Sequence, residues 1–269
     1  MDEYRNANRA LWNEWADIHS RSTFYDLEGF KAGATHLDDF ELQELGDVSG
    51  KSLLHLQCHF GMDSLSWARL GARVTGVDFS DRAIALARDL AEELDLAADF
   101  ICSDIYALPE VLQGQFDIVY TSKGVLVWLP DLKGWAEVIA DFLKPGGTFY
   151  LCEFHPYAGI FDESHPTSLR IRYPYFHSPE PMVFDVQGSY AEPQAQVEQK
   201  VEYEWAHSLS DIVNSLIGAG LRIEHLNEFP FTDFPALPEL MEQCEDGFWR
   251  LKAHDGSVPL MFSIKATKR

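Results

Sequence analysis

Strand-like and helix-like segments alternate between residues 52 and 154, and this alternation limits the possible fold more than any other feature. Neighbouring parallel strands need a crossover connection, which is usually a helix, so regular alternation is typical of a parallel sheet. With two further strand-like runs near the C-terminus, the sequence predicts a doubly wound α/β fold. Its sheet would be mostly parallel and seven-stranded, with helices on both faces. The expected strands are 52–58, 73–79, 99–103, 116–121, 148–154, 221–229 and 259–267.

Helix signals lie between these runs. Ser80 is a good N-cap for a helix whose residues Ile84, Ala87 and Leu90 fall on one face. Residues 131–143 have the same amphipathic period, and the sequence Lys-Pro-Gly-Gly at 144–147 is expected to end that helix.

The rest of the chain is expected to complete one domain, 1–269. Residues 1–48 are rich in aromatic side chains and predict a helical cap over the sheet, ahead of a core at 49–155. Prolines interrupt 156–206, which we interpret as an inserted antiparallel flap after the fifth strand. Residues 207–269 resume with Ser208 and Asp211 at capping-box spacing, followed by a helix and the last two strands.

Charge and cysteine content limit the partners and the compartment. The chain has 269 residues, with 43 acidic and 21 basic side chains, which gives a formal net charge of −22. This charge opposes binding to nucleic acids and to anionic membranes, both of which need clustered Lys and Arg. No signal-like or membrane-spanning segment is found, so we expect a cytoplasmic protein. The cysteines have no metal-like spacing, and Cys58, Cys102 and Cys152 are expected to be buried, reduced thiols.

The ends of the first four strands carry the candidate functional residues, because ligands of open parallel sheets bind beyond the carboxyl ends of the strands. A turn at 57–61 leads into a helix N-terminus, which favours a carboxylate or a phosphate. Asp78 ends the second strand and is suited to accept hydrogen bonds from two ribose hydroxyls. The third strand is followed by Asp104 and Ile105, and the fourth by Ser122 and Lys123.

The order of these segments resembles the class I S-adenosylmethionine-dependent methyltransferases, a seven-strand Rossmann-like family. Gly76-Val77-Asp78-Phe79-Ser80 is similar to the family's ribose-binding strand end. Residues 116–120 are similar to its fourth strand, and 143–147 to the turn before its fifth strand. The first turn of the family usually has an acidic residue, an apolar residue and then Gly-x-Gly-x-Gly. Here it reads His55-Leu56-Gln57-Cys58-His59-Phe60-Gly61, with only the last glycine and with histidine in place of the acid.

The resemblance implies S-adenosyl-L-methionine as the cofactor and a small molecule as the methyl acceptor. It implies that Asp78 binds the ribose, that Phe79 lies beside the adenine, and that Asp104 and Ile105 contact the adenine amine and ring. The backbone of the first turn would lie near the cofactor, and two aromatic residues of the N-terminal segment are candidates to close over its sulfonium or carboxylate. The remaining candidate contacts are Gln57, His59, Gly61, Ser80, Ser122, Lys123, Trp15 and Tyr25.

Glu153 and His155 follow the fifth strand and are the candidate proton acceptors for catalysis. The acceptor pocket is expected to be built by the cap, the insertion and residues 230–256. The fourth strand lacks the Asn-Pro-Pro-Tyr or Asp-Pro-Pro-Tyr sequence of enzymes that methylate base amines, which also favours a small acceptor.

Two other functions stay open. A nicotinamide-dependent dehydrogenase would use the same strand-two acid, but it requires G-x-G-x-x-G in the first turn, and two of those glycines are missing. A non-catalytic cofactor-binding protein on the same fold is the other alternative. Whether the protein is a monomer or a homodimer is not indicated by the sequence.

Overall fold

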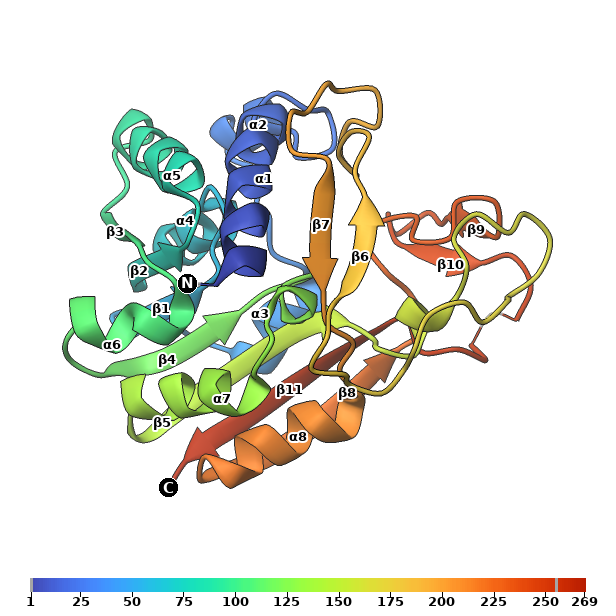
Figure 1. Ribbon diagram of the computed structural model, residues 1–269. Helices are drawn as coiled ribbons and strands as arrows, with labels where there is room; N and C mark the ends of the chain where they lie inside the picture. The colour runs from blue at the N-terminus through green and yellow to red at the C-terminus, as the bar shows by residue number, and fades with distance from the viewer. Residues whose placement is uncertain (1, 255) are drawn as a thin grey trace.

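A seven-stranded sheet forms the centre of the computed structural model, which describes residues 2–254 and 256–269 (Figure 1). The strand order is β3-β2-β1-β4-β5-β11-β8. Neighbours from β3 to β5 are parallel, and β11 is antiparallel to both β5 and β8. The predicted mostly parallel sheet of seven strands is confirmed. Its strands are β1 (Ser52–Leu56), β2 (Arg73–Asp78), β3 (Ala98–Cys102), β4 (Phe116–Thr121), β5 (Leu143–Phe154), β8 (Leu221–Phe229) and β11 (Met261–Lys268).

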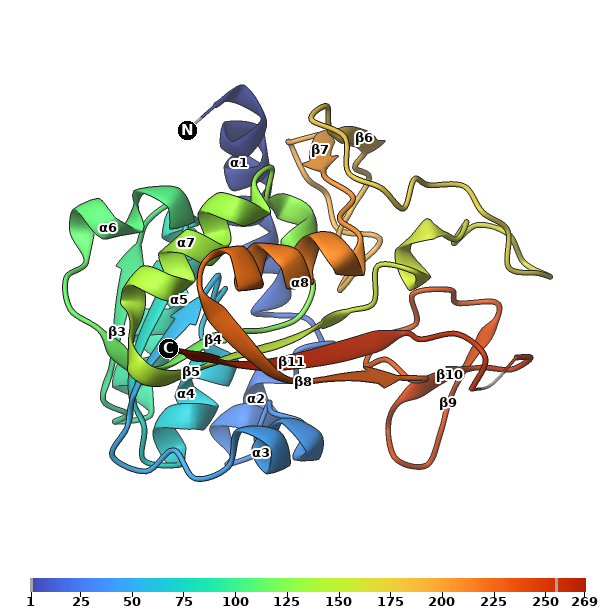
Figure 2. The same ribbon diagram turned by 90° about the horizontal axis from the view of Figure 1, so that it is seen from below.

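Helices cover both faces of this sheet, as Figure 2 shows with α7 and α8 on one side and α3 and α4 on the other. Ser80 caps α5 by accepting a hydrogen bond from the backbone N–H of Ala83, and Ser208 and Asp211 form the predicted capping box of α8. The helices that connect or flank the sheet strands are α3 (Asp39–Leu45), α4 (Met62–Arg69), α5 (Asp81–Glu93), α6 (Leu108–Val111), α7 (Leu132–Phe142) and α8 (Leu209–Gly218).

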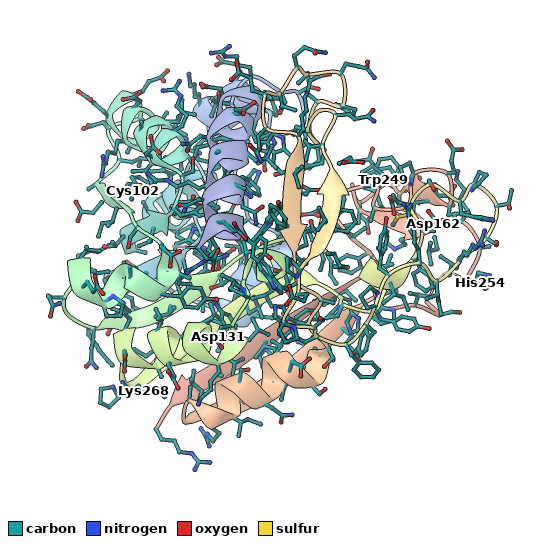
Figure 3. The ribbon with its side chains drawn as sticks, viewed as in Figure 1. Cys102, Asp131, Asp162, Trp249, His254 and Lys268 are labelled. Carbon is teal, nitrogen blue, oxygen red and sulfur yellow. The ribbon has the colours of Figure 1, made fainter. Side chains whose placement is uncertain are left out.

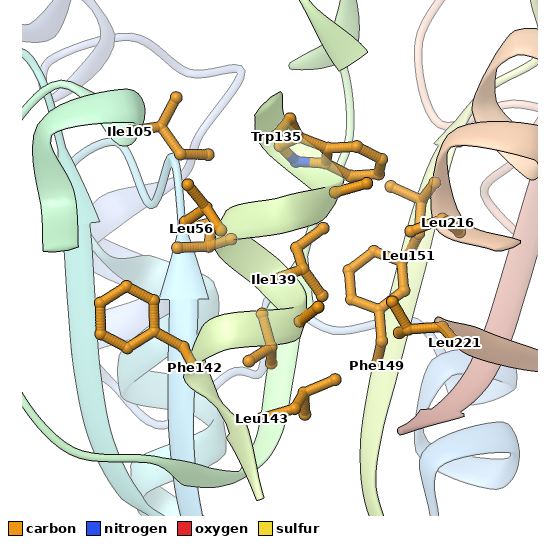
Figure 4. Close-up of a cluster of buried hydrophobic side chains, with 14 of the residues drawn as sticks. Leu56, Ile105, Trp135, Ile139, Phe142, Leu143, Phe149, Leu151, Leu216 and Leu221 are labelled. Carbon is orange, nitrogen blue, oxygen red and sulfur yellow. The ribbon is translucent and has the colours of Figure 1, made fainter. Parts of the chain in front are cut away.

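Two apolar layers hold the sheet from its two faces. Trp135 and Ile139 of α7 pack against Phe149 and Leu151 of β5 and against Leu216 of α8, all of them fully buried (Figure 4). Each fully buried side chain of this size contributes about 1.5–3 kcal/mol relative to exposure. The layers therefore fix the strands, and with them the positions of the strand ends.

The fifth strand begins earlier than the sequence predicts. The helix before it ends at Phe142, as expected, but β5 starts at Leu143 and runs through the Pro-Gly-Gly segment. Gly146 has a φ of +76°, and the pairing of β4 with β5 shifts register between Phe116 and Ile118. The helix therefore ends before the glycines are reached, and the glycines lie where the strand is irregular.

The N-terminal segment and the insertion lie side by side above the sheet (Figure 1). The segment contains α1 (Glu3–His19) and α2 (Leu27–Lys31), and the insertion contains an antiparallel hairpin of β6 (Met182–Asp185) and β7 (Val201–Glu204). Asn8 fastens the two together: its Nδ2 donates to the Tyr203 carbonyl at 2.7 Å, and its Oδ1 accepts from the Tyr203 N–H at 2.9 Å. Three single-turn helices, η1 (Ile105–Ala107), η2 (Leu126–Trp128) and η3 (Ala158–Ile160), and a second hairpin, β9 (Met241–Gln243) with β10 (Trp249–Leu251), complete the fold.

The prediction for one cysteine is wrong. Cys58 and Cys152 are buried, but Cys102 is exposed because it ends β3, which is the edge strand of the sheet (Figure 3). Within the described ranges no helix is both long and apolar enough to cross a membrane.

Candidate functional site

The carboxyl ends of β1, β2, β3 and β4 open into one cavity of about 1040 Å³. The N-terminal segment, the insertion and residues 233–249 supply the rest of its wall. Most of the predicted site residues lie in this wall, although Trp15, Ser80, Glu153 and His155 do not. Those in the wall are Tyr25, Gln57, His59, Gly61, Asp78, Phe79, Asp104, Ile105, Ser122 and Lys123.

The turn after β1 has the left-handed backbone conformation that favours glycine, although two of the three residues that adopt it are not glycine. Gln57, His59 and Gly61 all have left-handed φ values, of +60°, +52° and +85°. Such a conformation costs about 1–3 kcal/mol at a non-glycine residue, so the surrounding structure must impose it. At Gly61 only glycine fits, because a Cβ there would lie 2.8 Å from Cζ of Phe100.

Asp78 links that turn to the end of β2. Its Oδ2 accepts a hydrogen bond from the His59 N–H at 2.9 Å, and its Oδ1 accepts from the Ser80 N–H at 2.8 Å. Burial raises the pKa of Asp78 to about 6, against the opposing effect of these backbone donors. The carboxylate oxygens keep further lone pairs that can accept from the hydroxyls of a sugar. Ser80 lies behind the wall, because its hydroxyl caps α5 and donates to Asn13.

The end of β3 carries an ion pair that the sequence does not reveal. Asp104 accepts from the N–H of Tyr106 at 2.9 Å and from Nη1 of Arg5, on α1, also at 2.9 Å. Ile105 is buried beside it, and the aromatic ring of Phe79 lines the same cavity. A polar group next to an apolar slot is the pattern expected for a purine site.

His55 stands at the position where the methyltransferase family that the sequence resembles has an acid, and it links two segments through hydrogen bonds. Its ring is buried, with Nδ1 2.8 Å from the hydroxyl of Ser64 and Nε2 3.0 Å from that of Ser122. Burial lowers the pKa of His55 to about 4, so the ring is neutral at pH 7. It therefore joins α4 to the loop after β4 without placing a charge under the cavity.

Gln57 offers an unused acceptor in the cavity wall. Its Nε2 donates to the carbonyl of Val125 at 3.1 Å, whereas its Oε1 is buried and has no hydrogen-bond partner among the described residues. Such an orphaned atom is costly unless a ligand or water satisfies it. The ammonium group of an amino-acid ligand would supply the missing donor.

Lys123 lies in a buried ion cluster. Its Nζ bonds to the carboxylate of Asp38, lies 3.1 Å from Oδ2 of Asp233, and lies 3.7 Å from Oε2 of Glu41. Burial opposes its charge, but the carboxylates more than offset this and raise the pKa of Lys123 above its ordinary value. The partners come from distant parts of the chain, and no local pattern in the sequence points to them.

Glu153 supports a loop rather than facing the cavity. Its carboxylate accepts from the backbone N–H groups of Gly124, Val125 and Leu126 at 2.5, 2.8 and 3.1 Å, and from that of Phe154 at 2.7 Å. Gly124, Val125 and Phe154 line the cavity, but Glu153 itself does not, and the residue is only 4% exposed. The expectation that Glu153 faces the acceptor pocket is therefore not met.

His155 is also outside the wall of the cavity. Its Nε2 lies 2.9 Å from Oε1 of Glu228 on β8, and its Nδ1 accepts from the Tyr157 N–H at 3.1 Å. Both ring nitrogens are thus engaged, one by β8 and one by the backbone directly after β5. The expectation that His155 lies beside the acceptor is therefore not met either.

The tip of the insertion touches the N-terminal segment above the first turn. The hydroxyls of Tyr25 and Tyr190 are 2.5 Å apart, and Nε2 of His19 lies 2.6 Å from Oγ of Ser189. Trp15 donates to the carbonyl of Gly188 at 2.9 Å and packs beneath this contact, outside the cavity wall. Trp12, which lies next to Trp15 on α1, lines the cavity instead of Trp15.

The cavity wall also contains a histidine–carboxylate pair and several aromatic side chains. His36, in the loop between α2 and α3, bonds through Nδ1 to the carboxylate of Asp63 in the first turn of α4. Phe154, Phe234 and Trp249 line the cavity from β5 and from the 233–249 segment, with the rings of Phe154 and Phe234 4.7 Å apart. None of these residues was among the predicted contacts, because tertiary folding alone brings them together.

Comparison with known proteins agrees with this geometry. Residues 53–147 match the family described as a methyltransferase domain. This segment resembles a methyltransferase domain. Over 130 residues it is 32% identical to the "Ubiquinone biosynthesis O-methyltransferase" of Shewanella pealeana, an alignment that covers 47% of this chain and 55% of the relative. The chain thus spans about half the length of the curated relatives it matches.

Solved structures show the same fold. An S-adenosylmethionine-dependent methyltransferase from Mesorhizobium loti superimposes with a TM-score of 0.61, at 23% identity, over 88% of this chain and 100% of that one. The glycopeptide N-methyltransferase MtfA, solved with S-adenosyl-L-methionine, gives a TM-score of 0.54 at 17% identity, over 86% of this chain and 92% of that one. The predicted Rossmann-like fold is confirmed.

Proposed function

We propose that this protein binds S-adenosyl-L-methionine and transfers its methyl group to a hydroxyl of a small molecule. The observation that carries the proposal is the position of Asp78, which lies in the cavity wall at the end of β2 and is tied to the first turn by the His59 N–H. A carboxylate at this strand end is suited to hold the ribose of an adenosyl group.

The residues around Asp78 fit the rest of that ligand. Ile105 and Phe79 offer an apolar slot for the adenine, next to the carboxylate of Asp104. The buried Oε1 of Gln57 lacks a donor, and the ammonium of the methionine part would supply one. The N-terminal end of α4 favours the carboxylate of the same part.

The chemical demands on the chain are modest. The sulfonium of the bound cofactor supplies a methyl group that is already activated. The protein has to hold the acceptor atom in line with it, and alignment of this kind contributes on the order of 7–11 kcal/mol. The rings of Trp12 and Trp128 line the cavity and help to exclude water from it.

The acceptor is a small molecule, since the cavity is bounded by the N-terminal segment, the insertion and residues 233–249. A chain of net charge −22 also repels nucleic acids. Oxygen is the proposed nucleophilic atom, in line with the name of the curated relatives, which are O-methyltransferases.

Incubation with S-adenosyl-L-methionine that carries a radiolabelled methyl group tests this function. Label should pass to members of a panel of phenols, alcohols, amines and thiols, with the phenols and alcohols preferred. Binding of cofactor without transfer to any member would support the non-catalytic alternative. Fluorescence titration with NADH should show no binding, whereas tight binding of NADH would favour a dehydrogenase.

A further inference from the structure

His36 and Asp63 form a pair that neither the predicted site nor the proposed function uses. The backbone N–H of His36 donates to Oγ of Ser66 at 3.1 Å, which fixes the loop against α4. Nδ1 of the ring bonds to the carboxylate of Asp63, and the ring of Tyr25 stacks on it at 5.9 Å with an angle of 15°. The imidazole is therefore held in one orientation from two sides.

The other nitrogen of His36 is available to a ligand. His36 lines the cavity, and Nε2 has no hydrogen-bond partner among the described residues. A histidine whose Nδ1 is held by a carboxylate presents Nε2 as a proton acceptor, as in other histidine–carboxylate pairs. Burial disfavours the charge of His36, but Asp63 outweighs this and raises the pKa of His36.

Three ionisable groups close to His36 in the cavity wall already have partners. Lys123 is held by the carboxylates of Asp38 and Asp233. The hydroxyl of Tyr25 bonds to that of Tyr190, and Nε2 of His59 bonds to His19. His36 thus combines a free acceptor nitrogen, a fixed orientation and access to the cavity.

We propose that His36 is the general base of the reaction, that Asp63 is its positioning residue, and that the acceptor is an aromatic hydroxyl. This inference rests on the proposed function and specifies its substrate class. The aromatic ring is inferred from Phe154, Phe234 and Trp249, which line the same cavity as His36 and offer faces and edges for a planar ligand.

The step balances without any further reactant. The O–H bond of the acceptor breaks, and its proton passes to Nε2 of His36. The oxygen forms a bond to the methyl carbon, and the carbon–sulfur bond breaks with its electron pair remaining on sulfur. Asp63 stabilises the imidazolium, which then releases the proton to solvent.

Other charged groups also affect the pKa of His36, and they determine which variants the experiment must compare. Lys123 disfavours its protonation, whereas Asp233 and Asp63 favour it, and His59 faces it from the first turn. A change at Asp63 should therefore move the pKa of His36 downward. The exposed His254 is not among the residues that line the cavity and provides a matched control (Figure 3).

The experiment compares the parent protein with His36→Gln, Asp63→Asn and His254→Gln. Titration with S-adenosylhomocysteine comes first, and all four proteins should bind it alike. Failure of the parent to bind would overturn the proposed function itself, independently of His36. The probe is then 4-hydroxyacetophenone, whose phenol and phenolate forms absorb at different wavelengths and which is protonated in neutral solution.

On the complex with S-adenosylhomocysteine, the parent and His254→Gln should bind the probe with the spectrum of the phenolate. His36→Gln should bind it as the phenol, and methyl transfer from S-adenosyl-L-methionine should be about 10²–10⁴-fold slower in single turnover. NMR of the histidine rings should show a lower pKa for His36 in Asp63→Asn. The assignment would be overturned if the parent complex did not bind the probe or bound it without forming the phenolate. It would also be overturned if His36→Gln gave the same spectrum as the parent, or if the pKa of His36 did not change in Asp63→Asn.

Discussion

The backbone N–H of His59 donates to the carboxylate of Asp78 over 2.9 Å, and this bond joins the ends of two neighbouring parallel strands. The bond helps to explain how His59 keeps a left-handed φ of +52° in a turn where the resembling family has glycine. The residue proposed to hold the ribose also shapes the turn proposed to hold the methionine part. Changes at Asp78 should therefore affect both ends of the cofactor.

Replacement of Asp78 by alanine should weaken binding of S-adenosylhomocysteine by about 1–3 kcal/mol, the scale of a buried charged acceptor. Isothermal titration calorimetry measures this loss. Asp99→Ala, at an exposed position on β3, is the control and should bind like the parent. Equal affinity in the Asp78 variant would remove this residue from the site.

Stability should depend on pH through the same carboxyl group. The pKa of Asp78 is about 6 in the folded protein, above its ordinary value of 3.8, so folding favours the protonated form. As the pH rises from about 4 through 6, the free energy of unfolding of the parent should fall relative to Asp78→Asn, by at most about 3 kcal/mol. Urea denaturation of both proteins at several pH values measures the difference, and a parent that gains stability over this range would contradict the prediction.

Gly61→Ala should destabilise the fold by about 1–3 kcal/mol through a close contact and a strained backbone. A Cβ there would lie 2.8 Å from Phe100, and the φ is +85°. Gly146→Ala is a matched control with a similar φ of +76° but no atom within 4 Å of the added Cβ. Thermal denaturation should show a larger loss at Gly61 than at Gly146, and equal losses would mean that the close contact has no effect.

Glu153→Gln should lower the free energy of unfolding by about 1–3 kcal/mol, since an amide oxygen replaces a carboxylate that accepts from four backbone N–H groups. Chemical denaturation tests this, with the exposed Glu242→Gln as the control. Any remaining folded protein should keep the pH profile of methyl transfer, because Glu153 supports the loop and takes no proton. A pH profile that loses one titration in this variant would indicate that Glu153 acts as a base.

Lys123→Met should cost about 3–5 kcal/mol, because it leaves Asp38, Glu41 and Asp233 without their cation. The loss should increase with pH, as burial raises the pKa of Glu41 to about 7 and its charge then appears without compensation. Lys133→Met, at an exposed position on α7, should change stability little. Denaturation at pH 6 and pH 8 compares the two variants, and equal losses for both would show that the cluster is not stabilised by its lysine.

Local sequence patterns predict those features of the fold that depend on neighbouring residues in the chain. The end of β2 at Asp78 and the position of Asp104 shortly after β3 follow from apolar runs and turn signals, and the capping box of Ser208 and Asp211 follows from their spacing. The sequence predicts a proton-accepting role for Glu153 that its surroundings do not support, because nothing in the sequence shows that four backbone N–H groups point at its carboxylate.

The pairs that complete the cavity join distant parts of the chain. Arg5 with Asp104, and His36 with Asp63, become neighbours only through the packing of α1 and of the 32–38 loop over the sheet. No periodicity or local motif connects such residues, so sequence reasoning could name the segments that build the pocket but not their contacts.

Calorimetric titration of the unmodified chain with the demethylated product nucleoside is the most direct check on the whole account. We expect saturable one-to-one binding that displaces a fluorescent adenosyl analogue from the cavity. Absence of heat and of displacement at millimolar ligand, in a protein shown to be folded by circular dichroism, would contradict it.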